Sequence, residues 1–250
     1  MVHGETDKEL ANKKQQVLER LGYLDDRSEK FANEACIDRY LRARDGNVEK
    51  AAEMLRESIK WRREFGIDAL DPAKFPADIE GGKFYICQAE NGQPVMIMRK
   101  RSSRLERHEE EGYVEFMCNT LESATRLMPE GIETWVWIMD LKGYSSRNSP
   151  RVQVTLNVLK ILANHFPERM GKCYIVDAPS IFSLLWSAVH LFVDPVTKEK
   201  INFIYSSDYD ENGLRKDGKS DTSNFGKYIS FLRSPYHSEK YKKILNQVHH

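Results

Sequence analysis

The feature that most constrains the fold is a long uncharged segment, residues 178–193, which contains no Asp, Glu, Lys or Arg. It begins at Ala178-Pro179 and ends at Asp194-Pro195, after which charged residues return. A membrane-spanning helix needs about 20 consecutive apolar residues, so this segment is too short to span a bilayer. It is also too apolar for a surface helix, which carries a single apolar stripe. Two interpretations follow: a helix buried in the core, or a helix that covers an apolar cavity and at times faces lipid.

The overall composition predicts a cytoplasmic protein of one large domain or two small ones. The chain has 250 residues, and its 38 basic and 38 acidic side chains give a formal net charge of zero, which argues against a nucleic-acid binder. The first residues show neither a secretory signal nor a lipidation pattern. The four cysteines are far apart and form no Cys-x-x-Cys pair, as is typical of reduced thiols. Any membrane contact is therefore expected to be peripheral.

The N-terminal part is expected to be an all-helical lobe, residues 1–70. Apolar residues at helical spacing predict helices over 7–22, 28–44 and 47–65, and Ser28 is a candidate cap for the second of these. Prolines and a Gly-Gly pair then mark the exit from this lobe.

The second domain, residues 75–248, has the pattern of an α/β fold. A hairpin is predicted over 84–98, with Asn-Gly in its turn. Strands and helices then alternate, which predicts a mostly parallel sheet covered by helices, with the hairpin on one side. The predicted strands are 134–139, 172–176 and 201–205, and the predicted helices are 109–128, 149–166, the uncharged segment, 227–232 and 238–248. Residues 206–225 are polar and predict a loop.

A basic segment follows the predicted hairpin, and it has two interpretations. Arg99, Lys100 and Arg101 are consecutive, with Arg104 and Arg107 close behind. Such a run usually marks a solvated loop. It also suits a patch that contacts anionic lipid head groups.

Motifs for catalysis or for metal binding are absent from the sequence. It contains no dinucleotide-binding fingerprint, P-loop or nucleophile elbow, and its seven histidines show no zinc spacing. Asp140 and Asp177 follow predicted strands, so they are either an acid/base pair or ordinary turn residues. We therefore expect no enzyme activity, no metal and no cofactor.

Several ordered motifs resemble the CRAL-TRIO family of lipid-binding domains, and in particular its phosphatidylinositol transfer branch. The matching segments are YLRARDGNVEKAAEMLRESIKWRREFGI (40–67), VWIMDLKG (136–143), PERMGKCYIVDAP (167–179) and FVDPVTKEKI (192–201). The resemblance implies a helical N-terminal lobe, then a helix-covered sheet enclosing an apolar lipid pocket. In the family a mobile helix gates this pocket, and the uncharged segment matches it here.

The function implied by the resemblance is non-enzymatic exchange of phosphatidylinositol between membranes, or its presentation to a lipid kinase. The expected partners are the bound phospholipid and, transiently, a membrane surface, and the protein is expected to be a monomer. The resemblance assigns the lipid head group to Arg44, Glu168, Thr197 and Lys200, with Arg42 and Arg169 as weaker candidates. Arg44 and Lys200 would hold the phosphate, Thr197 would donate its hydroxyl, and Glu168 would accept from inositol hydroxyls or brace the basic groups. The gate and acyl pocket are assigned to Ile181, Phe182, Leu185, Trp186, Val189, Phe192, Trp135 and Trp137.

Two departures from the family pattern leave the ligand open. Asp45 stands where many phosphatidylinositol-binding members carry Lys, and it lowers the local positive charge. Trp135 and Trp137 stand where the phosphocholine site has two hydroxyl side chains, so phosphatidylcholine is not expected to bind in that mode.

Two alternative functions therefore stay open. One is a carrier or sensor of an isoprenoid, a sterol-like molecule or haem, the last needing an axial ligand such as His165, Tyr174 or Cys173. The other is a lipid-acting hydrolase with Asp140 or Asp177 as its base.

Overall fold

The computed structural model describes residues 6–100, 110–145, 147–148 and 150–249. The chain divides into two compact units: residues 1–69 with 160–168, and residues 70–159 with 169–250. The segment 160–168 thus belongs with the N-terminal residues, although the sequence pattern places it in the second domain.

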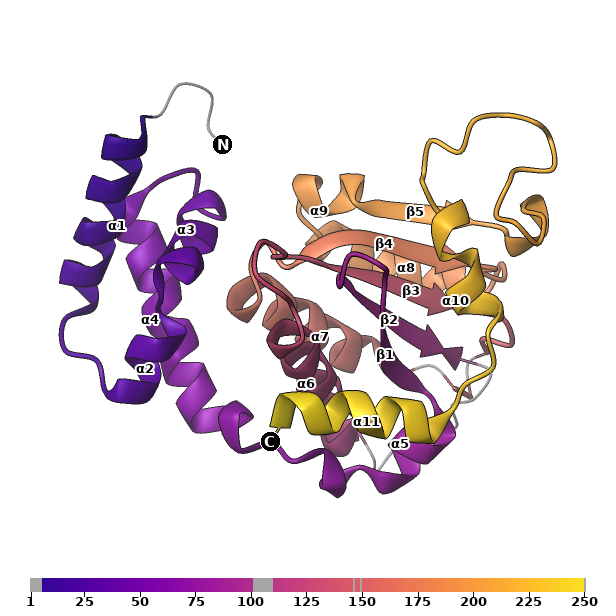
Figure 1. Ribbon diagram of the computed structural model, residues 1–250, viewed down its shortest axis with the longest axis horizontal. Coiled ribbons are helices and arrows are strands. Elements are labelled where there is room, and N and C mark those ends of the chain that lie inside the picture. Colours follow the sequence, from indigo (N-terminus) through magenta and orange to yellow (C-terminus); the bar gives the residue numbers. More distant parts are fainter. Residues whose placement is uncertain (1–5, 101–109, 146, 149, 250) are drawn as a thin grey trace. The chain divides into compact units, whose positions relative to one another are not determined.

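The first unit is helical, and its second predicted helix is in fact two helices. The first ends with Ala32 as its C-cap. Asn33 begins the second as its N-cap, since its side-chain oxygen accepts a hydrogen bond from the backbone N–H of Cys36 at 3.0 Å. The expected cap Ser28 lies inside the first of the pair, which Asp25 caps instead. The helices are α1 (Asp7–Leu21), α2 (Asp26–Phe31), α3 (Glu34–Arg42) and α4 (Val48–Phe65), followed by a 3-10 turn (Ile67–Ala69) (Figure 1).

Residues 160–168 pack against α4 in this unit. The His165 ring stacks on Trp61 with centroids 4.2 Å apart and planes at 3°, and its Nδ1 lies 3.0 Å from the hydroxyl of Ser58. Burial, with the nearby positive charges of Arg62 and Lys160, lowers the pKa of His165 to about 4. His165 is therefore a neutral packing residue at physiological pH.

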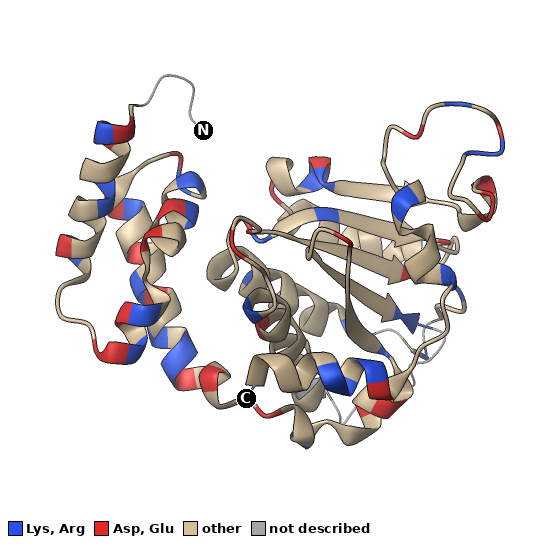
Figure 2. Cartoon of the chain, in the orientation of Figure 1, with Lys and Arg blue, Asp and Glu red and all other residues tan. Residues whose placement is uncertain are grey.

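The second unit is built on one sheet with the strand order β1-β2-β3-β4-β5 (Figure 1). β1 pairs with β2 antiparallel, and every other pair is parallel, so the prediction of a mostly parallel sheet with a hairpin on one side is confirmed. The strands carry few charges, and Figure 2 draws them mainly in tan. Their bounds are β1 (Phe84–Gln88), β2 (Pro94–Arg99), β3 (Trp135–Asp140), β4 (Met170–Val176) and β5 (Ile201–Ile204), preceded by η2 (Pro72–Lys74) and α5 (Pro76–Gly81).

The connections between parallel strands cover one face of the sheet. The strand order advances in one direction and such crossovers are right-handed, so their helices lie on the same side. Ring contacts agree, since Phe116 of α6 meets Phe84 of β1 and Trp186 of α8 meets Phe203 of β5. We call this side the crossover face. Its helices are α6 (Glu110–Arg126), the part of α7 (Val152–His165) before residue 160, α8 (Phe182–Val189) with the 3-10 turn η5 (His190–Phe192), and α9 (Pro195–Glu199).

The opposite face is covered by the C-terminal part of the chain. Tyr174 of β4 packs on Phe225 and Tyr228 with centroids 5.1 and 5.6 Å away. Tyr85 of β1 packs on Tyr241 of α11. The elements here are η6 (Ser206–Asp208), η7 (Gly226–Tyr228), α10 (Ile229–Arg233) and α11 (Ser238–His249). All five of these rings are well buried, so this face is closed.

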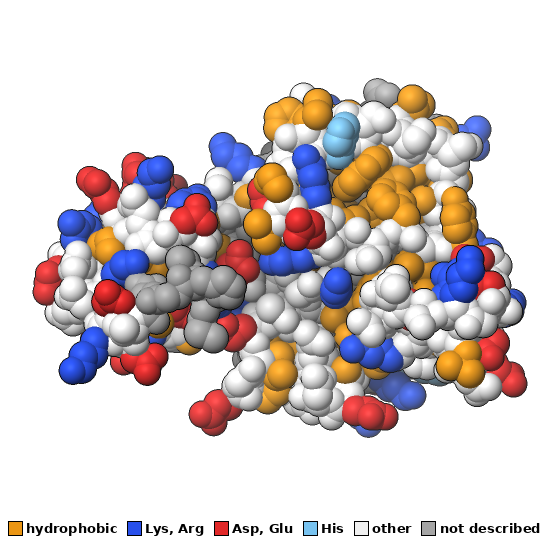
Figure 3. All heavy atoms as spheres, turned by 90° about the horizontal axis from the view of Figure 1, so that it is seen from above, with side chains coloured by type: hydrophobic (Ala, Val, Ile, Leu, Met, Phe, Trp, Pro, Cys, Tyr) orange, Lys and Arg blue, Asp and Glu red, His pale blue; other side chains and the backbone are white. Residues whose placement is uncertain are grey.

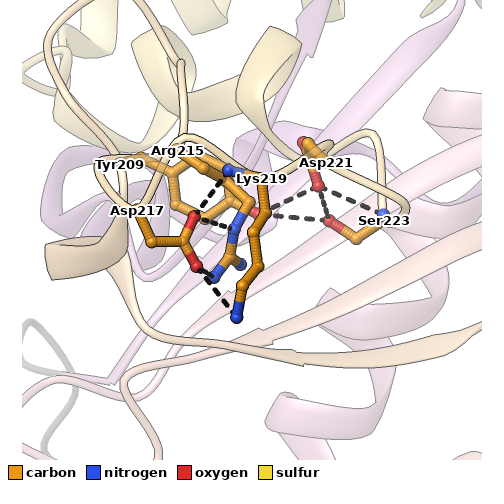
Figure 4. Close-up of polar contacts among 6 residues, drawn as sticks. All are labelled: Tyr209, Arg215, Asp217, Lys219, Asp221 and Ser223. Carbon is orange, nitrogen blue, oxygen red and sulfur yellow. Dashed lines mark hydrogen bonds and ion pairs between the residues drawn. The ribbon is translucent and has the colours of Figure 1, made fainter.

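The predicted polar loop, residues 206–225, is held by its own side chains (Figure 4). The Asp221 carboxylate accepts from the Tyr209 hydroxyl at 3.0 Å, the Ser223 hydroxyl at 2.5 Å and the Gly226 N–H at 2.7 Å. Tyr209 is only 1% exposed. Arg215 and Asp217 form a bidentate ion pair nearby.

The basic segment does not form a surface patch over the residues that the structure describes. Arg99 is 4% exposed, and its guanidinium donates to the carbonyls of Leu232 and Ser234 at 2.9 and 2.7 Å. Lys100 is 5% exposed, and burial lowers its pKa to about 8. Both interpretations of the segment, a solvated loop and a lipid-contacting patch, are therefore wrong for these two residues. Arg101, Arg104 and Arg107 lie outside the described residues.

Candidate functional site

The crossover face of the sheet is incompletely covered near β5. Trp137, Cys173 and Ile201 are neighbours across three strands, and Met139, Ile175 and Phe203 form the next such row. Trp137 and Cys173 are each 5% exposed, whereas Phe203 is 50% exposed. Met139 is only half-buried although β3 is the central strand. An apolar surface therefore remains accessible at this end of the sheet.

The uncharged segment forms α8 and η5, and one side of it faces outward. Phe182 and Val189 are buried, which is the side that packs on the protein. Leu184 is 74% exposed and Leu191 is 73% exposed. The interpretation of a helix buried in the core is thus wrong for the outer side.

The outward residues of this segment belong to a larger apolar patch. Figure 3 shows hydrophobic side chains gathered on the side of the second unit where β5 and α9 lie. Contiguous apolar surface of this kind marks a binding site for protein, ligand or membrane. We define the apolar patch as the exposed residues Ile181, Leu184, Leu191, Phe192, Val196, Phe203 and Tyr205.

The inner side of α8 rests on a few aromatic contacts. Phe182 meets the ring of Tyr144 edge-on, with centroids 5.4 Å apart. Trp186 meets Phe203 edge-on at 5.4 Å, and both Trp186 and Leu185 are half-buried. The helix carries no charged side chain, so lifting it away breaks no ion pair. This packing is compatible with a movable cover.

Trp135 and Trp137 lie in the packed part of the face. Trp135 is fully buried, and Trp137 stacks on Phe84 with centroids 5.4 Å apart and planes at 20°. Their assignment to an acyl pocket stays a prediction.

The structure brings Thr197 and Lys200 together around Asp194. The Asp194 carboxylate caps α9 and accepts the backbone N–H of Thr197 at 2.8 Å. Partial burial acts to raise the pKa of Asp194, but hydrogen bonds from Thr197 and the nearby Lys200 ammonium bring it below its usual range. The Lys200 carbonyl accepts from the Cys173 N–H at 2.9 Å, which fixes this turn to β4. Sequence reasoning did not single out Asp194, although Asp-Pro before a helix is a capping signal.

Arg42 and Arg44, two of the arginine candidates, lie at the C-terminal end of α3. Arg44, in the first unit, is half-buried and donates to the Ala43 carbonyl at 2.8 Å. Arg42 pairs with Asp38 one turn earlier in α3. Arg44 is therefore the better placed of the two arginines for an outside ligand.

The two residues just before β4 differ in their role. Glu168 has a φ of 55°, a left-handed conformation that is uncommon for a side-chain-bearing residue and that clusters at functional sites. Arg169 donates to the Glu133 carbonyl at 3.0 Å and so braces the start of β3.

The two carboxylates considered for catalysis both have structural partners. Asp177, with a φ of 52°, accepts the N–H and the hydroxyl of Ser206 at 2.8 and 2.6 Å. Asp140 accepts the Lys142 N–H at 3.1 Å. These hydrogen bonds are those of turn residues.

The candidate haem ligands are also engaged. His165 is stacked on Trp61, and the Tyr174 hydroxyl donates to the Ser223 carbonyl at 2.8 Å. Burial raises the pKa of the Cys173 thiol to about 12. Within the part of the chain that the structure describes, no group of three or more His, Cys, Asp or Glu side chains is placed to hold a metal.

Comparisons with known proteins agree with this architecture. The family model of the CRAL/TRIO domain matches residues 79–221, and that of the CRAL/TRIO N-terminal domain matches residues 8–57. A CRAL-TRIO domain-containing protein of Schizosaccharomyces pombe is 31% identical over 212 residues, covering 82% of this chain and 20% of that protein. The phosphatidylinositol transfer protein PDR17 of Saccharomyces cerevisiae is 29% identical over 189 residues, covering 70% of this chain and 53% of that protein. The chain thus spans between a fifth and about half of the length of these relatives.

A solved structure shows the same fold. The crystal structure of Sfh5 superposes with a TM-score of 0.63 and 15% identity, covering 96% of this chain and 94% of that chain. None of the helices in the described residues is both long enough and apolar enough to cross a bilayer.

Proposed function

Because the chain belongs to the CRAL/TRIO domain family, we propose that it binds a phospholipid, with phosphatidylinositol as the main cargo, and carries it between membranes. The observation that carries this proposal is the uncharged cover, α8 with η5, lying beside an incompletely covered apolar sheet face. The similarity to a phosphatidylinositol transfer protein supports the choice of cargo. The protein acts as a monomeric, non-enzymatic carrier in the cytoplasm that touches membranes transiently.

In the proposed cycle, the apolar patch meets the bilayer and α8 moves away from Phe203 and Tyr144. The acyl chains enter and lie against the crossover face, and the helix closes over them. Burial of each methylene stabilises the complex by roughly 0.8 kcal/mol, so the chains supply most of the affinity. A helix without charged groups can enter the interface without bringing ions into lipid.

The head group is selected by charge. In the second unit, Lys200 holds the phosphate and Thr197 donates its hydroxyl. Arg44 and Glu168, in the first unit, are the other head-group candidates: Arg44 as a cation for the phosphate and Glu168 as an acceptor for inositol hydroxyls. In the free protein Asp194 holds Thr197 and neighbours Lys200, so the phosphate competes with this carboxylate. Arg42 and Arg169 stay the weaker candidates: Arg42 forms an ion pair with Asp38, and Arg169 donates to the Glu133 carbonyl. A loaded carrier of this kind presents the inositol head group to a lipid kinase.

Removing either cation is expected to slow transfer. In Arg44→Ala and Lys200→Ala, the rate of transfer of labelled phosphatidylinositol between vesicles should fall about tenfold or more, because a hydrogen bond to a charged group contributes roughly 1.5–3 kcal/mol. Lys198→Ala, which removes the same side chain two residues earlier in α9, should transfer at the wild-type rate. Equal transfer rates for Lys200→Ala and Lys198→Ala would show that Lys200 does not bind the head group. The absence of phosphatidylinositol transfer by the wild type would defeat the proposal.

A further inference from the structure

Trp137 carries a buried hydrogen-bond donor that has no acceptor among the described residues. Its indole Nε1 is buried and unpaired, and the whole residue is 5% exposed. Native proteins pair nearly all such buried groups, and an exception calls for water or a bound molecule to complete it. Trp137 lies on β3, which pairs with a parallel strand on each side. The indole N–H is therefore a buried donor whose acceptor lies outside the described residues.

The surroundings of this donor are apolar and uncharged. On the neighbouring strands, Met96 and Cys173 stand level with Trp137, and Ile201 stands beyond Cys173. Burial holds the Cys173 thiol in its neutral form by raising its pKa to about 12. Phe84 stacks on the indole. A phosphate placed here would lose its hydration without gaining a cation, so an anionic acceptor is disfavoured.

The incompletely covered part of the same sheet face begins close to Trp137. Met139, the next residue on that face of β3, is half-buried, and so is Ile201. Phe203, in the same row as Met139, is 50% exposed. Trp137 thus belongs to the row of residues next to the incompletely covered apolar surface.

We propose that the Trp137 indole N–H donates to an uncharged oxygen, a hydroxyl or a carbonyl, of the hydrophobic molecule held against the crossover face. This inference rests on the proposed function and specifies the chemistry of its ligand. The oxygen belongs either to an ester carbonyl of an acylated lipid or to the hydroxyl of an uncharged alcohol. Both present the same acceptor to the indole, and neither needs a cation.

The test compares three probes of equal chain length in the full chain: 1-octadecene without oxygen, 1-octadecanol with a hydroxyl, and methyl stearate with a carbonyl. Each is offered at the same mole fraction in phosphatidylcholine vesicles, and the amount bound is measured by mass spectrometry after the vesicles are removed. At least one oxygen-bearing probe should bind about tenfold better than 1-octadecene, as expected for one buried hydrogen bond, and the better of the two identifies the source of the oxygen. Trp137→Phe keeps the ring and removes the donor, so this preference should disappear. Trp61→Phe, in the first unit and outside the proposed binding machinery, should keep it.

A spectroscopic measurement on the wild type tests the same inference without depending on whether Trp137→Phe folds. The chain has four tryptophans, and the Trp137 indole N–H resonance should move downfield with the preferred oxygen-bearing probe and stay in place with 1-octadecene. Equal binding of all three probes, or a preference that persists in Trp137→Phe, would overturn the inference while leaving the carrier function intact. If none of the probes binds and phosphatidylinositol transfer is also absent, both the inference and the proposed function fail.

Discussion

Replacing Leu184 and Phe192 together with glutamate is expected to abolish vesicle binding and lipid transfer. These side chains are 74% and 67% exposed, so the substitutions leave the folded core untouched. In the proposed cycle they enter the bilayer surface, where a charged side chain costs about 2.5–3.5 kcal/mol at the centre of a membrane helix and less near the interface. Two new carboxylates should therefore weaken membrane contact at least a hundredfold. Vesicle co-sedimentation and the transfer rate measure the effect.

The matched control is Leu214→Glu. Leu214 is an apolar residue with a similar exposure of 66%, but it lies in the polar loop and outside the apolar patch. This variant should bind vesicles and transfer lipid like the wild type, and all the variants should unfold at the same temperature. An equal loss in Leu214→Glu would show that any added charge is harmful. Unchanged binding in the double variant would show that the patch does not meet the membrane.

Replacing Trp135 with alanine is expected to destabilise the second unit by about 3–5 kcal/mol. Trp135 is fully buried on the central strand, and removing a large buried ring loses apolar burial and leaves a cavity. Denaturant unfolding followed by circular dichroism measures the change in the free energy of unfolding. Trp186→Ala removes the same side chain from a half-buried position on α8 and should cost much less. A smaller loss for Trp135→Ala than for Trp186→Ala would contradict the described packing.

The sheet could be predicted from the sequence because its signals are local. Residues 134–139 are apolar on both faces, as expected for a strand buried between two helical layers, and β3 occupies Trp135–Asp140. The alternation of strands and helices then predicted a mostly parallel sheet with the hairpin on one side, which the strand pairing confirms. The ends of several elements differ from the prediction, as for α7, which begins at Val152 rather than at the predicted Ser149-Pro150; Ser149 lies outside the described residues.

Features that depend on distant partners could not be predicted. Arg99 is read from the sequence as a surface cation, yet its guanidinium bonds to carbonyls of Leu232 and Ser234, which are more than 130 residues away. The sequence around Arg99 gives no sign of these partners. The break at Asn33 was missed for the opposite reason: the apolar spacing continues through it, and only the capping side chain interrupts the helix.

The candidate site was predictable in composition more than in geometry. The absence of charge over 178–193 indicated a special helix, and the structure shows which side of it faces outward. Asp194 lies beside Thr197 and Lys200 because it caps the short helix α9. The capping residue is visible in the sequence, but the residues that surround it are not. The unpaired indole N–H of Trp137 has no sequence signal, because tryptophans at strand centres usually serve packing alone.

Native mass spectrometry of the purified chain tests the central claim most directly, namely that the uncharged helix closes over a bound lipid. After incubation with vesicles containing phosphatidylinositol and removal of the vesicles, the account predicts a species heavier than the polypeptide by the mass of one phosphatidylinositol molecule. The same species should be lost when Leu184 and Phe192 are glutamates. A spectrum that contains only the bare polypeptide, both as purified and after incubation, would contradict the account.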